Sequence, residues 1–403
     1  MIADRGLRIA DWKTVALDEV ATIERSAIQP EAISQGTAYL GLEHIESGGK
    51  ILGAKPVDEG ELASSKFKFT AHHVLYGKLR PYLAKIACPD FTGICSTDIL
   101  PILPGSNLER RFLCYFLRQP SMVDYANSRA AGANLPRLSP SALAGFEIPL
   151  PPLAEQRRIA EVLDRAEALR AKRRAALAQL DSLTQSLFLD LFGDPKANPK
   201  GWPIKTLGDL VAEFRYGSSN KSANQGKPAL RIPNVAGGTI DLTNLKLVPV
   251  DVAEFERLRL RDGDLLFVRT NGNPDFVGRC AVFDSKAAAT SGFAGNEFIF
   301  ASYLIRARLT ATNIAPVFLR EYLLGDEGRR QLRSRSKTSA GQFNINTESL
   351  GAIPVPLPPT TLQREFARRV RAVEALKTAQ RASLAELDAL FATLQHRAFR
   401  GEL

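Results

Sequence analysis

Two stretches of the chain place cationic and amide side chains directly after an apolar, strand-like run. The first carries Lys78, Arg80 and Tyr82 on one side of an alternating pattern, and in the second Arg269 aligns with Lys78. Arg and Lys side chains can donate to guanine edges, Asn can pair with adenine, and all of them also bind phosphate. Both stretches are therefore candidate DNA contacts, and surface charges beside a sheet edge are the alternative. The candidates of the second stretch are Arg269, Thr270, Asn271 and Asn273.

Two further groups of polar residues are candidates for the same chemistry. His44 and Asn234 occupy matching places, each after a predicted strand. A run of basic residues before the second half's Pro-rich segment suits contact with phosphates, which would supply affinity and salt dependence but no sequence choice. A solvated helix face is the alternative for this run. It comprises Arg329, Arg330, Arg333, Arg335 and Lys337.

Sequence patterns of enzymes are missing or incomplete. The chain has no Gly-rich phosphate loop, and its four histidines form no metal-ligand set. The segment 273–276 has only part of the Asn-Pro-Pro-aromatic motif of amino-methyltransferases, and a turn explains it better. Asp275, Asp284 and Lys286 fit a nuclease-type pattern, but this pattern occurs in only one half of the chain. We therefore expect no catalytic, metal or cofactor site in this chain.

Length and composition bound the class of protein. The chain has 403 residues, 45% of them hydrophobic, which suits two folded domains plus connecting elements. Its 53 Lys and Arg residues outnumber 43 Asp and Glu residues, giving a net charge of +10, which favours a polyanionic partner. The four cysteines show neither zinc spacing nor a disulfide framework. With no signal-peptide pattern in residues 1–12 and no membrane-length apolar run, we expect a soluble, cytoplasmic protein.

The chain repeats itself. Leu150-Pro151-Pro152 and Leu357-Pro358-Pro359 each open a long helical stretch, and the apolar positions of the two stretches match at the offset that separates these openings. The regions before them also correspond, because Trp12 matches Trp202 and residues 40–45 match 230–235 at one common, slightly shorter offset. A duplicated half is a way to build a two-fold object from one chain, and double-stranded DNA is a two-fold ligand.

The repeat predicts an α+β protein of four segments. Residues 1–150 and 194–357 mix short strand-like runs with Gly, Pro, Asn and Asp turns, and form two α/β-type domains. Residues 151–193 and 358–403 form two long helices, because residues 153–192 contain neither Gly nor Pro and 360–399 repeat their pattern. Each helix of about 40 residues would be about 60 Å long.

The two helices are predicted to pair as an antiparallel coiled coil. Their apolar positions step by three and four residues. Halfway along, this seam falls on Arg170 and Arg173 in one helix and on Lys377 and Gln380 in the other. The shared interruption favours pairing of the helices with each other, and the short connections between segments require opposite directions. We expect a dumbbell with a pseudo-two-fold axis, in which the helices are spacers with mixed charge; two independent domains with helical tails are the alternative.

Two side expectations concern the apolar residues of these helices. A local shift of phase would bring Leu169 and Leu376 into the seam at the point where the polar residues interrupt it. On the outer faces, Val162, Leu183 and Phe188 would need covering by a partner.

The chain resembles the DNA-specificity subunits of type I restriction–modification systems over essentially its whole length. The helix opening Pro-Pro-Leu-Ala-Glu-Gln between two mixed domains is the most specific element. The second opening departs from it, with Thr360-Thr361-Leu362-Gln363, which affects the expected capping of that helix. The segments that carry the resemblance are 148–160, 353–359, 75–83, 93–96 and 263–269.

The resemblance implies a non-catalytic DNA reader. In such proteins each recognition domain reads one half of a bipartite, asymmetric target, and the helix pair sets the gap and docks two modification (methyltransferase) subunits. Those subunits bind S-adenosylmethionine and methylate adenine, and restriction motor–nuclease subunits join for cleavage. This chain would then hold no cofactor. The alternatives are a stand-alone DNA methyltransferase or nuclease, and a DNA-binding scaffold of another defence system.

Overall fold

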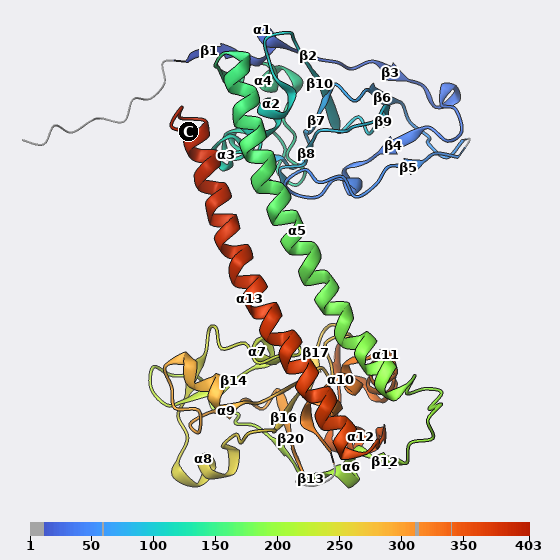
Figure 1. Cartoon of the computed structure of the whole chain (residues 1–403), viewed down its shortest axis with the longest axis vertical. Coiled ribbons are helices and arrows are strands. Elements are labelled where there is room, and N and C mark those ends of the chain that lie inside the picture. Colours follow the sequence, from blue (N-terminus) through green and yellow to red (C-terminus); the bar gives the residue numbers. More distant parts are fainter. Residues whose placement is uncertain (1–11, 59, 311–313, 340) are drawn as a thin grey trace, which may run out of the picture. The chain divides into compact units, whose positions relative to one another are not determined.

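The computed structural model describes residues 12–58, 60–310, 314–339 and 341–403 (Figure 1). The first 11 residues, where we expect no signal peptide, lie outside this range. Contacts divide the chain into two compact units: unit 1 comprises residues 1–174 and 382–403, and unit 2 comprises residues 175–381. Each unit therefore contains one mixed domain and parts of both long helices, whereas the sequence-based boundaries place the helices in segments of their own.

Unit 1 contains two main sheets and a two-stranded ladder. One sheet has the order β2-β10-β7-β8 and the other β3-β6-β9-β4-β5, while β1 pairs with β11. The bounds of its strands are β1 Lys13–Ala16, β2 Ala21–Ile23, β3 Ala27–Ile28, β4 Ala38–Leu40, β5 Lys55–Pro56, β6 Lys66–Phe69, β7 Val74–Gly77, β8 Ile86–Ala87, β9 Gly93–Cys95, β10 Ile99–Pro104 and β11 Glu147–Leu150. Its short helices are α1 Leu17–Val20, η1 Pro30–Ala32, η2 Leu42–His44, η3 Pro81–Leu83, α2 Arg110–Leu117, α3 Pro120–Ser128 and α4 Pro140–Ala144.

Unit 2 repeats this topology. Its sheets have the orders β13-β20-β16-β18 and β15-β14-β19, with the ladder β12-β23 and a further sheet β17-β22-β21. The strands are β12 Ile204–Thr206, β13 Val211–Tyr216, β14 Lys227–Leu230, β15 Lys246–Val248, β16 Leu265–Val268, β17 Thr270–Asn271, β18 Cys280–Val282, β19 Ile299–Phe300, β20 Leu304–Leu309, β21 Lys337–Ser339, β22 Gln342–Asn344 and β23 Pro354–Pro356. The helices are α6 Leu207–Leu210, α7 Ile232–Val235, α8 Val252–Leu258, α9 Ser285–Ala288, η4 Ala289–Ser291, α10 Pro316–Leu324, α11 Asp326–Arg335 and α12 Thr347–Gly351.

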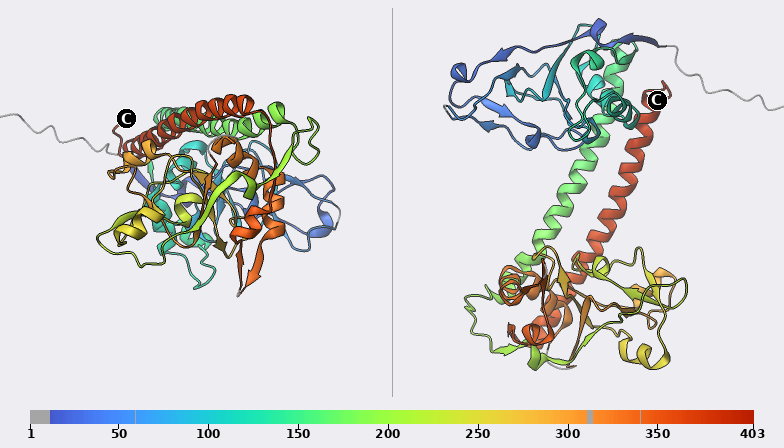
Figure 2. Two further views of the ribbon diagram at one scale, coloured as in Figure 1. Left: turned by 90° about the horizontal axis from the view of Figure 1, so that it is seen from below. Right: turned by 180° about the vertical axis from the view of Figure 1, so that it is seen from behind.

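The duplication extends to strand direction and register. In unit 1, β4 pairs in parallel with β9, and in unit 2, β14 pairs in parallel with β19. The other ladders between the described strands are antiparallel. Short helices follow β4 and β14 at matching places, with the offset that the sequence comparison predicts for this region. Figure 2 shows the strands and short helices of unit 2 from two further sides. The protein is therefore mixed α and β, as predicted, and its internal repeat is a repeat of topology.

The two long helices are α5, Leu153–Phe192, and α13, Thr360–Ala398. The helical runs predicted at 153–192 and 360–399 agree with these bounds to within one residue. Gly193 ends α5 with a φ of +77°, a backbone conformation that glycine adopts without steric cost. Within each described range, no helix is both long enough and apolar enough to span a membrane.

Within each unit the two helices lie side by side and run in opposite directions. In unit 1, Ile159 and Leu163 of α5 share a core cluster with Leu394 and Ala398 of α13, near the end of that helix. In unit 2, Phe366, near the start of α13, packs against Phe188 and Phe192 at the end of α5, with ring centroids 5.6 and 5.2 Å apart.

The polar interruption of the seam consists of ion pairs between the helices. In unit 1, Arg170 pairs with Asp388, with Nε and Oδ1 2.6 Å apart, and lies 4.4 Å from the ring of Phe391. In unit 2, Lys377 pairs with Asp181 at 3.1 Å. Arg170 corresponds to Lys377, and Asp181 to Asp388, at the offset that separates the two Leu-Pro-Pro openings. The duplicated interruption is thus one ion pair made twice.

The phase shift expected at Leu169 and Leu376 is wrong. These residues are 52% and 53% exposed, and the ion pairs of Arg170 and Lys377 lie in the seam instead. Phe188 was also expected on an outer face, and it is instead buried in unit 2, stacked on Phe318 with ring centroids 5.6 Å apart. Leu183 is 40% exposed, as expected.

A charge exchange tests the ion pair in unit 1. Arg170→Asp or Asp388→Arg alone is expected to lower the free energy of unfolding by about 1 kcal/mol, since each places like charges together at a partly buried site. The double variant should recover part of this loss, because the pair forms again with its charges exchanged, while Glu167 and Arg174 then face like charges. Chemical denaturation of the four proteins gives the coupling. Additive losses would show that the two side chains do not interact.

A buried glutamine at the start of each long helix ties it to the neighbouring domain. Gln156 accepts from the backbone N–H of Glu109 at 2.7 Å and donates to the carbonyl oxygen of Pro151 at 2.8 Å. Gln363 accepts from Ala315 N–H at 2.8 Å and donates to Pro358 at 2.7 Å. The departure of the second helix opening from the family motif therefore leaves this contact intact, because the glutamine is retained.

Removal of this glutamine should destabilise the protein. Gln363→Ala would leave the partly buried N–H of Ala315 and the buried carbonyl group of Pro358 without this partner, at a cost of about 2–4 kcal/mol in the free energy of unfolding. Urea denaturation checks this, with Gln179→Ala, at an exposed position of α5, as the matched control. Equal midpoints for both variants would contradict the role of the buried amide.

Candidate nucleic-acid interface

The candidate residues of the first stretch follow β7 in unit 1. Lys78 continues the strand pairing, because its N–H donates to the carbonyl oxygen of Asp98 at 2.9 Å and its own carbonyl accepts from Leu138 at 2.9 Å. Arg80 has a φ of +51°, which L residues other than Asn and Asp rarely adopt, and its N–H donates to Pro136 at 2.7 Å. The backbone therefore holds Arg80 in a strained turn.

The side chains of this turn are available to a ligand. Arg80 and Tyr82 are exposed and Lys78 is partly exposed. Across the parts of unit 1 that the structure describes, neither the Lys78 ammonium group nor the Arg80 guanidinium group makes an ion pair or hydrogen bond with protein. Strain at an exposed cationic residue is typical of binding sites.

The second stretch occupies the same place in unit 2. The N–H of Arg269 donates to Tyr303 at 2.9 Å and its carbonyl accepts from Ile345 at 3.0 Å, so it repeats the pairing of Lys78. Asn271 pairs with Phe343 across β17 and β22, as Arg80 does with Pro136. The structure thus brings Lys78, Arg80 and Tyr82 into correspondence with Arg269, Asn271 and Asn273, at one common offset in the sequence.

Local contacts orient the unit 2 side chains. The guanidinium group of Arg269 lies 4.7 Å from the ring of Tyr216 and donates to Ser302 at 3.3 Å. Asn271 and Asn273 use their carbonyl oxygens to accept backbone N–H groups two residues on, each at 2.9 Å. Their amide NH2 groups make no hydrogen bond within the described part of unit 2. Thr270 is buried and donates to Gln342 at 2.9 Å, so it supports the turn from inside.

His44 and Asn234 have the same local role in both units. The ring Nδ1 of His44 accepts from Gly41 N–H at 3.0 Å, and Asn234 Oδ1 accepts from Arg231 N–H at 2.9 Å. Asn234 is buried and also donates to the carbonyl oxygens of Asp241 and Thr243. Its amide is fully engaged in shaping the loop, so it has no group to offer to a base and we do not retain it as a contact. His44 stays a candidate, because it is partly exposed.

The basic run does not form one helix face. Four of its arginines lie on α11, whereas Lys337 begins β21. Arg333 forms an ion pair with Asp275 at 2.6 Å, and Arg329 donates to the backbone carbonyl oxygen of Asp275 at 3.0 Å. These contacts attach α11 to the turn after Asn273. Burial lowers the pKa of Arg329. Arg330 pairs with Glu327 and Arg335 with Gln331. The basic run therefore holds the turn after Asn273 in place through Arg329 and Arg333, in addition to adding positive charge near it.

Two residues that the sequence did not suggest border these turns. Arg137 forms the bridge opposite Leu79 and its Nε lies 3.3 Å from Asp98, while Asn344 pairs with Thr270 in unit 2. Arg137 and Asn344 are separated by the same offset as the long helices. Extending the alignment of the two halves from the Leu-Pro-Pro openings toward the N-terminus, at the same offset, would have matched Arg137 with Asn344.

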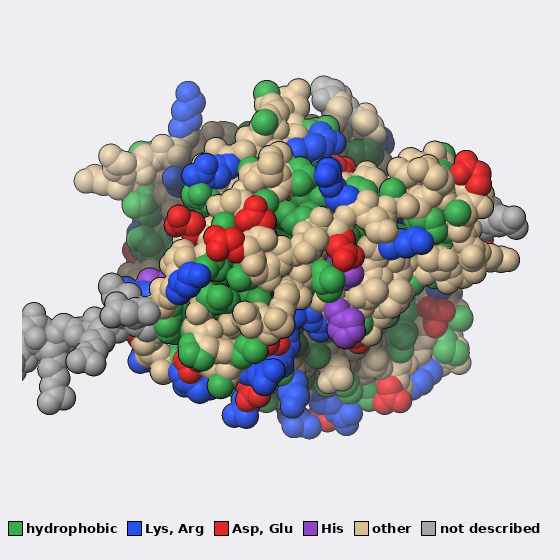
Figure 3. Space-filling model, turned by 90° about the horizontal axis from the view of Figure 1, so that it is seen from above, with side chains coloured by type: hydrophobic (Ala, Val, Ile, Leu, Met, Phe, Trp, Pro, Cys, Tyr) green, Lys and Arg blue, Asp and Glu red, His purple; other side chains and the backbone are tan. Residues whose placement is uncertain are grey.

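Basic and acidic side chains are interspersed on the face shown in Figure 3. The net charge of +10 is therefore not gathered in one patch on this face.

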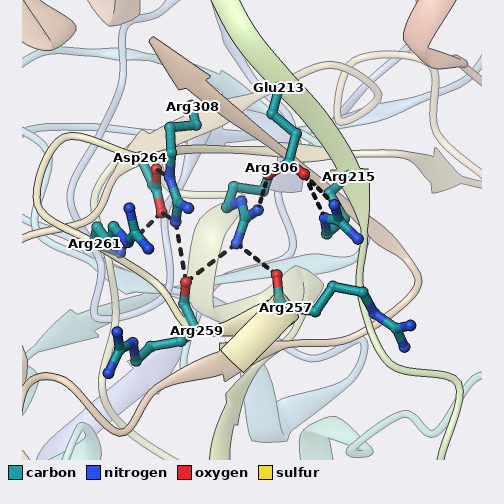
Figure 4. A network of polar contacts seen from close by, with 8 residues as sticks. All are labelled: Glu213, Arg215, Arg257, Arg259, Arg261, Asp264, Arg306 and Arg308. Atoms are coloured by element: carbon teal, nitrogen blue, oxygen red, sulfur yellow. Dashed lines mark hydrogen bonds and ion pairs between the residues drawn. The ribbon is translucent and has the colours of Figure 1, made fainter. Parts of the chain in front are cut away.

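A buried ion network supports the sheet that carries Arg269 (Figure 4). Arg306 of β20 is buried, pairs with Glu213 of β13 and donates to the carbonyl oxygens of Arg257 and Arg259 at 3.3 and 3.1 Å. Arg308 pairs with the buried Asp264 at 2.7 Å. The registers place Pro101 and Leu103 at the matching positions in β10 of unit 1. The two sheets thus share a topology, but buried ion pairs stabilise the sheet of unit 2 at positions where the sheet of unit 1 has apolar residues.

The acidic residues of the nuclease-type pattern have structural roles in the fold. Among the described residues, no group of three or more His, Cys, Asp or Glu side chains could hold a metal ion. Asp284 caps α9 by accepting from the N–H groups of Lys286 and Ala287, and Asp275 pairs with Arg333. All four cysteines are free thiols.

Comparison with known proteins finds similarity to DNA-specificity domains and specificity subunits. Residues 9–179 match the family model described as a type I restriction modification DNA specificity domain. This finding and the curated relatives confirm the resemblance to the specificity subunits of type I restriction–modification systems.

The relatives include the EcoKI specificity subunit of Escherichia coli (strain K12), 29% identical over 310 residues, 72% of this chain and 65% of that protein. The StySPI specificity subunit of Salmonella potsdam is 26% identical over 74% of this chain and 67% of that protein. The chain thus spans about two thirds of the length of these relatives.

Two solved structures share the fold. The type I restriction–modification S subunit from M. genitalium has a TM-score of 0.60 at 15% identity, covering 99% of this chain and 98% of the other. A chain from a study of complex assembly and conformational transition in a type I restriction–modification system has a TM-score of 0.58 at 23% identity, covering 97% and 98%.

Proposed function

We propose that the chain is the DNA-specificity subunit of a type I restriction–modification complex. One observation supports this most: the same strand-end turn occurs in both units, with Lys78 and Arg80 in one and Arg269 and Asn271 in the other. A duplicated scaffold that presents different side chains suits two different half-sites of one asymmetric target. Arg and Lys offer guanine readout and Asn offers adenine readout, and the same groups also bind phosphate.

The long helices serve as a spacer in this proposal. A continuous antiparallel coiled coil of α5 and α13 sets the gap between the half-sites and docks two modification subunits. Restriction motor–nuclease subunits join the complex for cleavage. The chain itself is non-catalytic and acts in the cytoplasm, and S-adenosylmethionine binds to the modification subunits.

Methylation sequencing tests the proposal. A host that expresses this chain with its genomic neighbours should carry a gapped, asymmetric motif with methyl-adenine on both strands, and deletion of this chain should remove it. Co-purification shows whether the complex forms. An intact complex with an unchanged methylome would assign the chain to another DNA-handling system, and methyl transfer or cleavage by the purified chain alone would make it an enzyme.

A further inference from the structure

Unit 2 contains a cavity that the DNA-reading role does not use. Its volume is about 760 Å³, within the range of small-molecule sites. The end of α5 and the linker after it form one wall, α10 and α11 form another, and the loop 237–239 and α13 complete the lining. Phe188, Leu189 and Leu324 supply an apolar surface.

The matching place in unit 1 is occupied by aromatic side chains. There Phe391 packs against Tyr115, with ring centroids 6.2 Å apart, and Arg170 lies over the Phe391 ring. Thr184 corresponds to Phe391 at the offset of the two Leu-Pro-Pro openings, and Glu321 corresponds to Tyr115 when the first residues of α2 and α10, Arg110 and Pro316, are aligned. Unit 2 thus replaces an aromatic pair by a small hydroxyl residue and a carboxylate.

The cavity lining is acidic. It holds six carboxylates against four basic groups, an excess of two negative charges. Ion pairs join Lys377 to two of the carboxylates, Arg320 to Glu321 and Arg330 to Glu327. The remaining basic group is Lys196. Within the described residues, Asp194 and Asp326 form no ion pair. The six carboxylates belong to Asp181, Asp194, Glu321, Asp326, Glu327 and Glu374.

An unsatisfied polar group also marks this cavity. Thr184 is 6% exposed, and its hydroxyl oxygen has no hydrogen-bond partner among the described residues. A buried hydroxyl without a partner is unfavourable. A hydrogen-bond donor bound in the cavity would satisfy it.

We propose that this cavity binds a linear aliphatic diamine or polyamine, once per chain. Two ammonium groups match the excess of two negative charges, and Asp194, Asp326 and the Thr184 hydroxyl are available to accept from them. The methylene chain packs on Phe188, Leu189 and Leu324. Unit 1 lacks the site because Phe391 and Tyr115 occupy it. The proposal does not depend on the DNA-reading role.

Isothermal titration of the full chain without DNA tests this site, with 1,4-diaminobutane and spermidine as probes. One site per chain is expected. The neutral 1,4-butanediol and the compact dication Mg²⁺ should bind at least tenfold more weakly. Asp194→Asn with Asp326→Asn should weaken diamine binding about tenfold or more, since two charge-assisted contacts are lost. Thr184→Phe with Glu321→Tyr, which imports the unit 1 residues, should abolish it.

The matched control is Glu161→Gln with Glu386→Gln, which makes the same charge change at exposed positions of α5 and α13. It should leave diamine binding unchanged. Absence of stoichiometric binding, or equal weakening by the control pair, would overturn the proposal. If N-acetyl-lysine amide bound more tightly than either amine, the cavity would belong to a lysine side chain of a partner protein. Asp194 and Asp326 are exposed, so their replacement by Asn should not affect folding. This variant therefore tests the site even if Thr184→Phe with Glu321→Tyr fails to fold.

Discussion

Replacement of Lys78 by Ala together with Arg80 by Gly is expected to weaken binding to one half of the DNA target by roughly 100-fold. Each cationic contact to a base or phosphate contributes about 1–3 kcal/mol. Glycine is chosen at position 80 because φ is +51° there, so the loss reports on the guanidinium group and not on added backbone strain. Competition binding of the assembled complex to duplexes altered in one half-site measures the effect.

The matched change is Arg269→Ala with Asn271→Ala in unit 2. It should affect only the other half-site, because the two turns belong to different units. Arg157→Ala, at an exposed arginine of α5 in unit 1, is the control for charge alone. If both double variants changed preference at the same half-site, the two-reader proposal would fail.

Loss of Glu213 is expected to destabilise unit 2 by about 3–5 kcal/mol. Glu213→Ala would leave Arg306 buried with no carboxylate, and a buried charge without its partner is costly. Glu213→Leu with Arg306→Met should recover part of the loss, since both charges are removed together but the hydrogen bonds of Arg306 to the Arg257 and Arg259 carbonyl oxygens are lost. Thermal and urea denaturation provide the measurement, and Glu256→Ala, at an exposed ion pair with Arg259, is the control.

The same network predicts a dependence on acid. The hydrogen bond with Arg215, and then the charge of Arg306, lower the pKa of Glu213 below its ordinary value of 4.5. A carboxylate with a lowered pKa contributes stability above its unfolded-state pKa, and this contribution is lost as the pH falls through the folded-state value. Between pH 5 and roughly pH 3, the free energy of unfolding should therefore fall more steeply with decreasing pH in the wild type than in Glu213→Gln. Parallel curves would exclude the contribution.

The repeat made much of the fold predictable from sequence. Gly and Pro bounded α5 and α13 to within one residue, and the polar residues Arg170 and Lys377 indicated helix pairing, because both copies interrupt the seam alike. The alignment of Lys78 with Arg269 was also sufficient to find matching strand ends. These features depend on local propensity and on spacing, which a sequence displays directly.

Features that depend on tertiary packing were not predictable. Phe188 has the spacing of an outer-face residue, and only the fold shows that α10 covers it. Asn234 has the composition of a DNA contact, but its amide is used within its own loop. Whether a polar side chain is free depends on which backbone groups surround it, and those come from distant parts of the chain.

The duplicated ion pair constrains how such a protein can change during evolution. Arg170 and Asp181 have the same spacing along α5 as their partners Lys377 and Asp388 have along α13. Inserting residues between Arg170 and Asp181 alone would make this spacing differ from the spacing of Lys377 and Asp388. Lineages that lengthen this segment should therefore do so by equal steps in both halves of the gene, so that length variants occur as paired events and single insertions are rare.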